Sequence, residues 1–424
     1  MNRKQRREAA AQGRRGGEAA PPPAGSALAA LYEEAVALRR AGRLDAALAT
    51  LERALAREPE QPFVLAELAQ VQRLRDEPGR AAQALRRALR AAPRSAELAF
   101  NLGHTLRDLG EEEEALRAFE RAAQLKPELA QALGDVGLSH HRLGRLEAAI
   151  EHYERALERA PDLTRVLTDL AVALLEAGQA RRAHEVAGDC LRREPRALAA
   201  MMVRAHAADE LGETAEAAAL LDLERLVRPA AVEAVEGYAS VAEFNAALRA
   251  HVEAHPSLAR QPNQRTTRGG QQTGDLNVEP RGPVAALEAL LQQRVRAYLD
   301  ALGRDPAHPY LAQRPAAFHL NLWATLLDSA GHQAPHIHPA AWVSGVYYLQ
   351  VPAEVRADDP GQQGWIEFGR APESFPLQAA PRVRRLQPEE GLLVLFPSYL
   401  YHRTIPFESG TRRISVALDA LPRA

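Results

Sequence analysis

The N-terminal half of this 424-residue chain repeats itself every 34 residues. Prolines mark the period, at Pro59, Pro93, Pro127, Pro161, Pro195 and Pro229. Alanine or glycine stands twelve and twenty-four places before every one of these prolines, and glycine stands seventeen places before five of the six, with Asp76 as the exception. Proline ends a helix, glycine permits a tight turn and small residues let two helices touch. Each period therefore predicts a pair of antiparallel helices.

This pattern resembles the tetratricopeptide repeat family, with six copies over residues 28–231. The resemblance implies an all-α solenoid whose hairpins contact mainly their neighbours, so we expect a right-handed superhelix that is independent of the C-terminal half of the chain. It also implies a groove that binds a protein or peptide partner. The lysine and asparagine clamp of the best-known peptide-binding members is missing. The inward positions include Tyr32, Val36, Phe100, His104, Leu138 and Val172, which predict either a hydrophobic peptide groove or ordinary packing between repeats.

Charge and composition exclude several classes of partner. The 53 basic and 55 acidic residues leave a formal net charge of −2, so we expect neither a nucleic-acid nor a membrane partner. Residues 1–27 carry a basic cluster followed by alanine, glycine and proline, which predicts a disordered tail and not a signal sequence. The single cysteine, Cys190, occupies a small repeat position and indicates a packed thiol in a reducing, cytoplasmic protein.

The 34-residue register ends near residue 232, and the second half has a different pattern. Helical spacing continues at 240–254, and a second helix is predicted over 284–302. Short alternating segments with turn signals between them then predict strands, at 318–327, 335–338, 342–351, 364–368, 382–386, 392–396, 399–405 and 412–418. The chain is thus predicted to be a multidomain α + β protein, with a jelly-roll domain over 236–424.

Three histidines are the strongest candidates for a metal site. His336 and His338 are two residues apart on a predicted strand, so their side chains should point the same way, and His402 ends a later strand. Three imidazoles that converge inside a barrel can occupy one face of a metal's coordination sphere and leave other positions open. A lone buried histidine is more often only a hydrogen-bonded core residue, so the neighbouring sequence has to decide.

The blocks around these histidines resemble the Fe(II)/2-oxoglutarate-dependent oxygenases, and an uncharacterised bacterial branch in particular. The blocks are His-Ile-His-Pro at 336–339, Ser-Gly-Val-Tyr-Tyr-Leu at 344–349, Phe-Pro-Ser at 396–398 and Arg-Ile-Ser at 413–415, with a polar opening segment at 268–273. The resemblance implies a double-stranded β-helix, with His336 and His402 as ligands of Fe(II). It further implies that Arg413 grips the far carboxylate of the co-substrate 2-oxoglutarate, with Ser415 beside it and Arg412 as the alternative anchor.

One position departs from the family pattern, because His338 stands where the family has an aspartate or glutamate ligand. His338 can be the third ligand, it can orient the site while water or another carboxylate completes the coordination, or the domain can have lost its iron chemistry. We favour the first interpretation because strand parity points both rings inward. Glu367 and Asp328 are distant candidates for a replacement carboxylate, and each is expected to be a surface or turn residue.

Three functions compete at this point. The first is an oxygenase that hydroxylates a protein or peptide brought by the repeats, in a cavity to which Trp323, Tyr347 and Tyr348 could contribute. The second is an interaction scaffold with an inactive barrel, and the third is a cupin-like metal enzyme with other chemistry. Because His402 and Arg413 occur together, the oxygenase is favoured, since neither alternative needs an anchor for a dicarboxylate.

Overall fold

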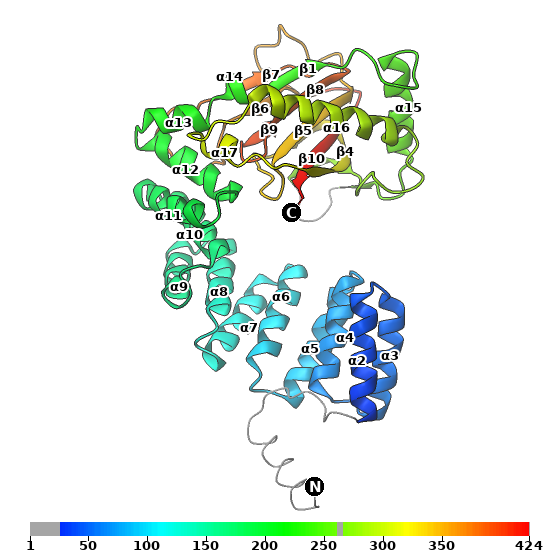
Figure 1. Cartoon of the computed structure of the whole chain (residues 1–424), viewed down its shortest axis with the longest axis vertical. Coiled ribbons are helices and arrows are strands. Elements are labelled where there is room, and N and C mark those ends of the chain that lie inside the picture. Colours follow the sequence, from blue (N-terminus) through cyan, green and yellow to red (C-terminus); the bar gives the residue numbers. More distant parts are fainter. Residues whose placement is uncertain (1–25, 261–265, 424) are drawn as a thin grey trace, which may run out of the picture. The chain divides into compact units, whose positions relative to one another are not determined.

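The structure is a computed structural model that describes residues 26–260 and 266–423 (Figure 1). The chain divides into two compact units, Met1–Ala173 and Leu174–Ala424. The tail expected at 1–27 lies outside the described residues as far as residue 25, and the first helix begins at Ala27.

The first unit is a stack of helical hairpins. Its helices are α2 (Ala27–Arg40), α3 (Leu44–Arg57), α4 (Pro62–Leu74), α5 (Pro78–Ala91), α6 (Ala96–Asp108), α7 (Glu112–Leu125), α8 (Ala130–Arg142), α9 (Leu146–Arg159) and the larger part of α10 (Thr164–Glu176). Each even-numbered helix and the next form one of the predicted pairs. The helical solenoid expected from the 34-residue period is confirmed.

The turn inside each hairpin needs a left-handed backbone. Gly42, Gly110 and Gly144 have φ of 72°, 78° and 73°, a conformation that costs glycine little. Asp76, the one exception in the glycine series, has φ of 60°. Aspartate is among the few other residues that tolerate this region, so the irregular repeat keeps the same turn.

Within a hairpin, the side chains that the two helices present to each other are matched in size. A Cβ atom added at Gly103 would lie 2.6 Å from the Phe119 ring, and one added at Gly137 would lie 2.7 Å from the Tyr153 ring. The first two repeats carry alanine at the equivalent of Gly103 and leucine at the equivalent of Phe119. Glycine thus appears where the partner helix presents an aromatic ring, which keeps the helix spacing constant.

The second unit combines the last repeats with the β-rich region. Its helices after α10 are α11 (Ala180–Arg193), α12 (Leu198–Glu210), α13 (Thr214–Leu220), α14 (Leu223–Leu226), α15 (Val241–Glu253), α16 (Pro283–Leu302) and α17 (Pro309–Ala312). The helices predicted over 240–254 and 284–302 are therefore present as α15 and α16.

The last repeats are tied to the β-rich region by buried hydrogen bonds. The Tyr399 hydroxyl donates to the Leu220 carbonyl at 2.6 Å, and the Tyr298 hydroxyl donates to the Leu226 carbonyl at 2.8 Å. Arg384 donates to the Leu223 carbonyl at 2.8 Å. Our expectation that the repeats are independent was wrong for this part of the stack. The repeated sequence pattern does not reveal which segment of the chain packs against the last hairpin.

The strands form two antiparallel sheets. The seven-stranded sheet has the order β1-β8-β5-β10-β4-β3-β2, and the three-stranded sheet has the order β7-β6-β9. The strands are β1 (Arg228–Ala231), β2 (Ala259–Arg260), β3 (Thr267–Gln272), β4 (Phe318–Gln333), β5 (Val343–Gln350), β6 (Ile366–Phe368), β7 (Arg384–Leu386), β8 (Leu392–Pro397), β9 (His402–Thr404) and β10 (Arg413–Pro422). The chain thus has a helical repeat region followed by a β-rich C-terminal region.

Three short segments differ from the sequence expectation. The sixth proline of the series, Pro229, lies in β1 and faces Val394 of β8, so the last period ends in the sheet. The polar stretch at 267–272, for which no strand was predicted, forms β3. Residues 335–338 do not form a strand within the described region, because Pro335 and Pro339 remove the amide donors that a ladder would need there.

Candidate functional site

Backbone pairing brings two of the three histidines together. His336 and His402 form an isolated antiparallel bridge, in which the amide of each donates to the carbonyl of the other at 3.1 Å. Their ring centroids are 4.2 Å apart. The amide of His338 donates to the Ser398 carbonyl at 2.9 Å, and its ring centroid lies 5.1 Å from each of the other two.

The hydrogen bonds of the rings determine their tautomers. Nδ1 of His336 contacts the Ala334 carbonyl at 2.7 Å, and Nδ1 of His402 contacts the Leu400 carbonyl at 3.1 Å. Nδ1 of His338 contacts Oδ1 of Asp419 at 2.6 Å. A carbonyl oxygen only accepts, so Nδ1 carries the proton in His336 and His402, and the carboxylate favours the same tautomer in His338. In each ring the nitrogen that remains to bind a metal is Nε2.

The three rings form a group that can hold a metal ion. One nitrogen from each of His336, His338 and His402 lies within 4.8 Å of the others. The pKa of His336 is lowered to about 4, mainly by burial and to a smaller extent by the neighbouring His338. Burial also lowers the pKa of His402 well below its usual value. The two rings are therefore neutral near pH 7, which is the form that binds metals.

Arg413 lies in the same pocket and has few partners. The pocket is lined by the three histidines and by Arg413, Ser415, Ala417, Trp323 and Tyr348, among others. The Arg413 side chain is 2% exposed, and its Nη2 donates to the Tyr348 hydroxyl at 3.2 Å, with the guanidinium 4.8 Å from the Tyr348 ring centroid. Its Nε has no hydrogen-bond partner. Burial lowers the pKa of Arg413. A buried guanidinium without an anion is costly unless a ligand supplies one.

Strand phase separates the two adjacent arginines. Arg413, Ser415 and Ala417 alternate along β10 and face the pocket. Arg412 is exposed, and its Nε donates to Asp328 at 2.9 Å. The structure thus brings Arg413 and Ser415 to the histidines and leaves Arg412 on the other side. Of the three candidate aromatic residues, Trp323 and Tyr348 line the pocket, whereas the Tyr347 hydroxyl donates to Asn245 at 2.7 Å.

The two carboxylates considered as replacement ligands are bound elsewhere. Glu367 is fully buried, and its oxygens accept from Arg370, Arg385 and Arg403 at 2.7 Å each. Our expectation that Glu367 is a surface residue was therefore wrong. Burial raises the pKa of Glu367, but the three arginines outweigh it and bring the pKa to about 2. Asp328 pairs with Arg412 and Arg260.

Asp419, the carboxylate that contacts His338, was not among the residues predicted from the sequence. It follows Arg413, Ser415 and Ala417 on the same face of β10, since it is the next residue of the same parity. Counting onward by two from the arginine would have identified it. The alternation was applied only to the expected ligands and the anchor.

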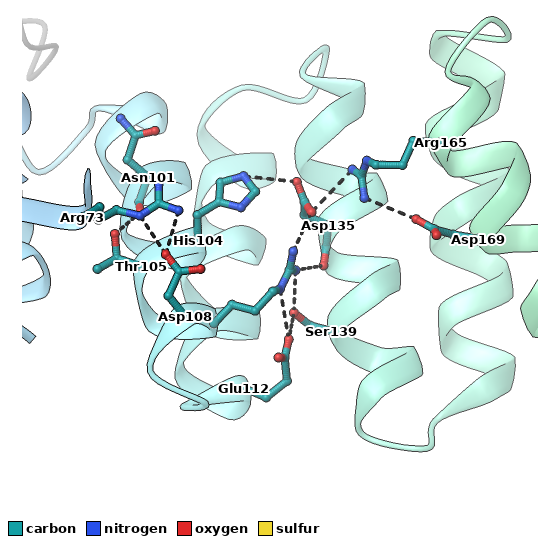
Figure 2. A network of polar contacts seen from close by, with 11 residues as sticks. Arg73, Asn101, His104, Thr105, Asp108, Glu112, Asp135, Ser139, Arg165 and Asp169 are labelled. Carbon is teal, nitrogen blue, oxygen red and sulfur yellow. Dashed lines mark hydrogen bonds and ion pairs between the residues drawn. The ribbon is translucent and has the colours of Figure 1, made fainter. Parts of the chain in front are cut away.

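The helices of the repeat unit are joined by a network of polar contacts, which Figure 2 shows. The first helices of successive repeats are linked by charged side chains. Arg107 of α6 donates from Nη1 to Oδ1 of Asp135 on α8 at 2.9 Å and from Nη2 to the Asp135 carbonyl at 3.0 Å. Arg165 of α10 lies 3.4 Å from Asp135 and donates to Asp169 at 3.3 Å. Neighbouring repeats are therefore joined by buried charged groups as well as by apolar contacts.

The aromatic inward positions are partly exposed and in contact with other rings. Tyr32 packs edge-on against Phe63, with ring centroids 5.4 Å apart, and both line a hollow together with Gln70 and Asn101. Phe100 packs against Phe119, with centroids 5.6 Å apart. These residues serve both packing and an accessible surface. No helix in the described part of the chain is long and apolar enough to span a membrane.

Comparison with known proteins identifies both regions. Residues 24–196 and 168–231 match family models described as "Tetratricopeptide repeat", and residues 321–419 match one described as "Putative 2OG-Fe(II) oxygenase". No curated protein matches the sequence. The chain thus carries tetratricopeptide repeats over residues 24–231, and its residues 321–419 are similar to the family described as putative 2OG-Fe(II) oxygenases.

Many solved structures are similar to the chain. One is MamA, at 24% identity and a TM-score of 0.37, which covers 38% of this chain and 94% of that chain. Another is pilF of Pseudomonas aeruginosa, at 23% identity and 0.42, which covers 47% and 90%. A third is YrrB, described as "a TPR protein with an unusual peptide-binding site", at 21% identity and 0.37, which covers 40% and 88%.

Proposed function

We propose that this chain, in which tetratricopeptide repeats precede a domain of the 2OG-Fe(II) oxygenase family, is an Fe(II)- and 2-oxoglutarate-dependent dioxygenase that hydroxylates its substrate. One observation carries the proposal. The buried guanidinium of Arg413, which has no carboxylate partner among the described residues, shares a pocket with three imidazoles whose Nε2 atoms are available. A metal dication and a dicarboxylate are the groups that this set of donors fits.

Each residue has a role in this proposal. His336, His338 and His402 hold Fe(II) through Nε2, with each ring fixed by its Nδ1 hydrogen bond. Arg413 binds the far carboxylate of 2-oxoglutarate through two parallel hydrogen bonds, and Ser415 contributes a hydroxyl on the same strand face. With dioxygen as the oxidant, bound Fe(II) and 2-oxoglutarate would supply the chemistry: one oxygen atom enters succinate as 2-oxoglutarate loses CO2, and the other is inserted into a C–H bond of the substrate. The protein positions these groups and excludes water.

The proposed activity requires a particular fold of the β-rich region and argues against two alternatives, an inactive scaffold and a domain without iron chemistry. We assign the two antiparallel sheets to a double-stranded β-helix, with the histidines where β9 and the loop before β5 meet. A scaffold with an inactive barrel is not favoured, because a buried, unpaired Arg413 lowers stability and brings a scaffold no advantage. The hydrogen-bond contact of His338 Nδ1 with Asp419 leaves Nε2 beside the other two rings, which argues against a loss of iron chemistry at this position.

The test is to load the full-length protein with Fe(II) under anaerobic conditions and to measure bound iron, 2-oxoglutarate affinity and succinate. His336→Ala and His402→Ala should abolish stoichiometric iron binding. Arg413→Ala should leave iron bound and eliminate succinate, and Arg413→Lys should weaken the co-substrate because it loses the fork. Arg412→Ala is the matched control. Wild-type protein that binds no iron, or an Arg413→Ala variant with wild-type turnover, contradicts the proposal.

We also propose that the repeats recruit a protein or peptide substrate through the hollow beside Tyr32 and Phe63. The partly exposed ring of Tyr32, backed by the buried ring of Phe63, lies next to the amides of Gln70 and Asn101. This arrangement suits an extended peptide, because amides bind its main chain and the exposed ring binds its apolar side chains. A peptide library incubated with the loaded protein should contain members that gain one oxygen atom. Tyr32→Ala should lower that yield while leaving 2-oxoglutarate binding unchanged. Equal yields from both proteins argue against recruitment here.

A further inference from the structure

We infer that Asp419 is a positioning residue that replaces, from behind His338, the carboxylate that the ligand set lacks. This inference rests on the proposed Fe(II) site and concerns how that site works with histidine at position 338. Asp419 is not itself a proposed metal ligand. It acts through the imidazole to which it is hydrogen-bonded.

The hydrogen bonds around Asp419 give it one orientation. Its Oδ1 lies 2.6 Å from Nδ1 of His338 and accepts a second hydrogen bond from the Ser344 hydroxyl at 2.6 Å. The Ser344 and Ser398 hydroxyls lie 2.8 Å apart, and a hydroxyl has one proton to donate. When Ser344 donates to Asp419, Ser398 therefore donates to Ser344. This chain of bonds fixes the carboxylate so that it accepts the Nδ1 proton of His338.

The carboxylate of Asp419 has no arginine or lysine partner among the described residues. Its nearest titratable neighbour is the His338 ring, which it contacts by the hydrogen bond at Nδ1. Glu367 and Asp328, the other two carboxylates considered at this site, are paired with three and two arginines. Their charge is thereby neutralised, whereas the negative charge of Asp419 is directed at the His338 ring.

The three proposed imidazole ligands explain why a negative charge at Asp419 would be favourable. Three neutral imidazoles leave the full charge of a metal dication in a pocket that already contains the buried Arg413. A family site with a carboxylate ligand removes one of those charges directly. A carboxylate hydrogen-bonded to a metal-bound imidazole increases the basicity of the ligand atom and lowers the charge of the site as a whole.

A single strand places both charged groups. Asp419 and Arg413 lie on the same face of β10, six residues apart, which is roughly 20 Å of extended chain. Ser415 and Ala417, between them, line the pocket. The anion is thus at the histidine end of the strand and the cation at the opposite end, where the far carboxylate of the co-substrate is proposed to bind.

The experiment measures metal binding alone, without turnover. Anaerobic titration of the full-length apoprotein with Fe(II), and with Co(II) followed by visible absorption, gives affinities and a ligand-field spectrum. Asp419→Asn keeps an acceptor for Nδ1 but removes the charge, so the affinity should fall about 10- to 100-fold and the Co(II) spectrum should shift. Asp328→Asn, which removes a carboxylate from the same sheet, should change neither. Thermal melts of the apoproteins check that each variant is folded.

Testing Asp419→Asn again in a protein that carries His338→Asp separates the effect of the lost charge from a structural effect. His338→Asp supplies the anion as a ligand, so Asp419→Asn should cause no further loss of affinity in that background. Loss of equal size in both backgrounds, or wild-type affinity and an unchanged Co(II) spectrum for Asp419→Asn alone, overturns the inference while the proposed function stands. Wild-type protein that binds neither metal overturns both.

Discussion

Two buried arginines, one in each unit, differ in what surrounds them. Arg107 in the repeats is 9% exposed and forms an ion pair with Asp135 at 2.9 Å, with further hydrogen bonds to the Asp135 carbonyl and Ser139. Arg413 in the β-rich unit is 2% exposed, and its guanidinium contacts the hydroxyl and ring of Tyr348 but forms no ion pair with any described residue. The first cation is neutralised by its own chain and the second is not.

This difference distinguishes a structural charge from a functional one. A buried charge that has its partner links neighbouring helices, and removing either member leaves the other unpaired. A buried charge without a partner reduces the stability of the free protein, and a ligand of opposite charge restores that stability. The same distinction applies to histidines, since the Nδ1 atoms of the site are satisfied by the protein and the Nε2 atoms are available.

The largest expected effect on stability is in the repeat network. Asp135→Ala removes the nearest carboxylate of Arg107 and leaves Glu112 at 3.5 Å, so it should destabilise the first unit by about 3 kcal/mol. Hydrogen exchange of α6 and α8 measures this locally, which avoids a two-state assumption for the whole chain. Replacing Arg107 and Asp135 together with Leu and Ala should cost less than Asp135→Ala alone. If the single variant is as protected as wild type, the network is not structural.

Glu367 is a buried charge of the second unit that is paired with arginines. Its contribution to folding stability should depend on pH. Its folded pKa of about 2 lies below the unfolded value, so its contribution to stability is present above about pH 4.5 and is lost as the pH falls toward 2. The contribution at neutral pH is about 3 kcal/mol. Urea unfolding of wild type and Glu367→Gln at pH 7 and pH 3 should therefore give a stability difference that shrinks at the lower pH. A difference independent of pH contradicts this assignment.

The unpaired cation gives a prediction of opposite sign. Arg413→Met has similar volume and no charge, so it should stabilise the ligand-free protein by about 1–3 kcal/mol. With the metal already bound to both proteins, addition of 2-oxoglutarate should raise the melting temperature of wild type and leave that of the variant unchanged. A variant that is less stable than wild type without ligand indicates that Arg413 has a structural partner.

A packing variant tests the size matching in the repeats. Gly137→Ala brings a Cβ to within 2.7 Å of the Tyr153 ring and should destabilise the first unit by about 1–3 kcal/mol. Gly79→Ala is the matched control, because a Cβ there meets nothing within 4 Å. Gly79 lies in the first turn of α5, so the control should be neutral or stabilise by up to about 1 kcal/mol. Equal effects of the two changes would show that helix propensity, not packing, determines the residue at 137.

Particular elements show how far the sequence could be interpreted. Most strands were predicted to within a few residues, because alternation and turn residues report on local geometry; β4 extends further, to Gln333. The strand expected at 335–338 was wrong, although His336 and His338 still meet His402. Their rings converge through the backbone contacts to His402 and Ser398, which are remote in sequence. The similarity of residues 321–419 to putative 2OG-Fe(II) oxygenases agrees with the metal and co-substrate that we propose for this site.

The sequence by itself determined the period of the repeats, the order of the β segments and the identity of the three histidines and the arginine. All of these depend on residue types at fixed spacings along the chain, and spacing is a local property. Only the tertiary structure decided which charges are paired. Asp419 could be matched to His338, Glu367 to three arginines and the last repeats to the β-rich region only after folding. Whether a buried charge is neutralised depends on groups that are remote in sequence and adjacent in space.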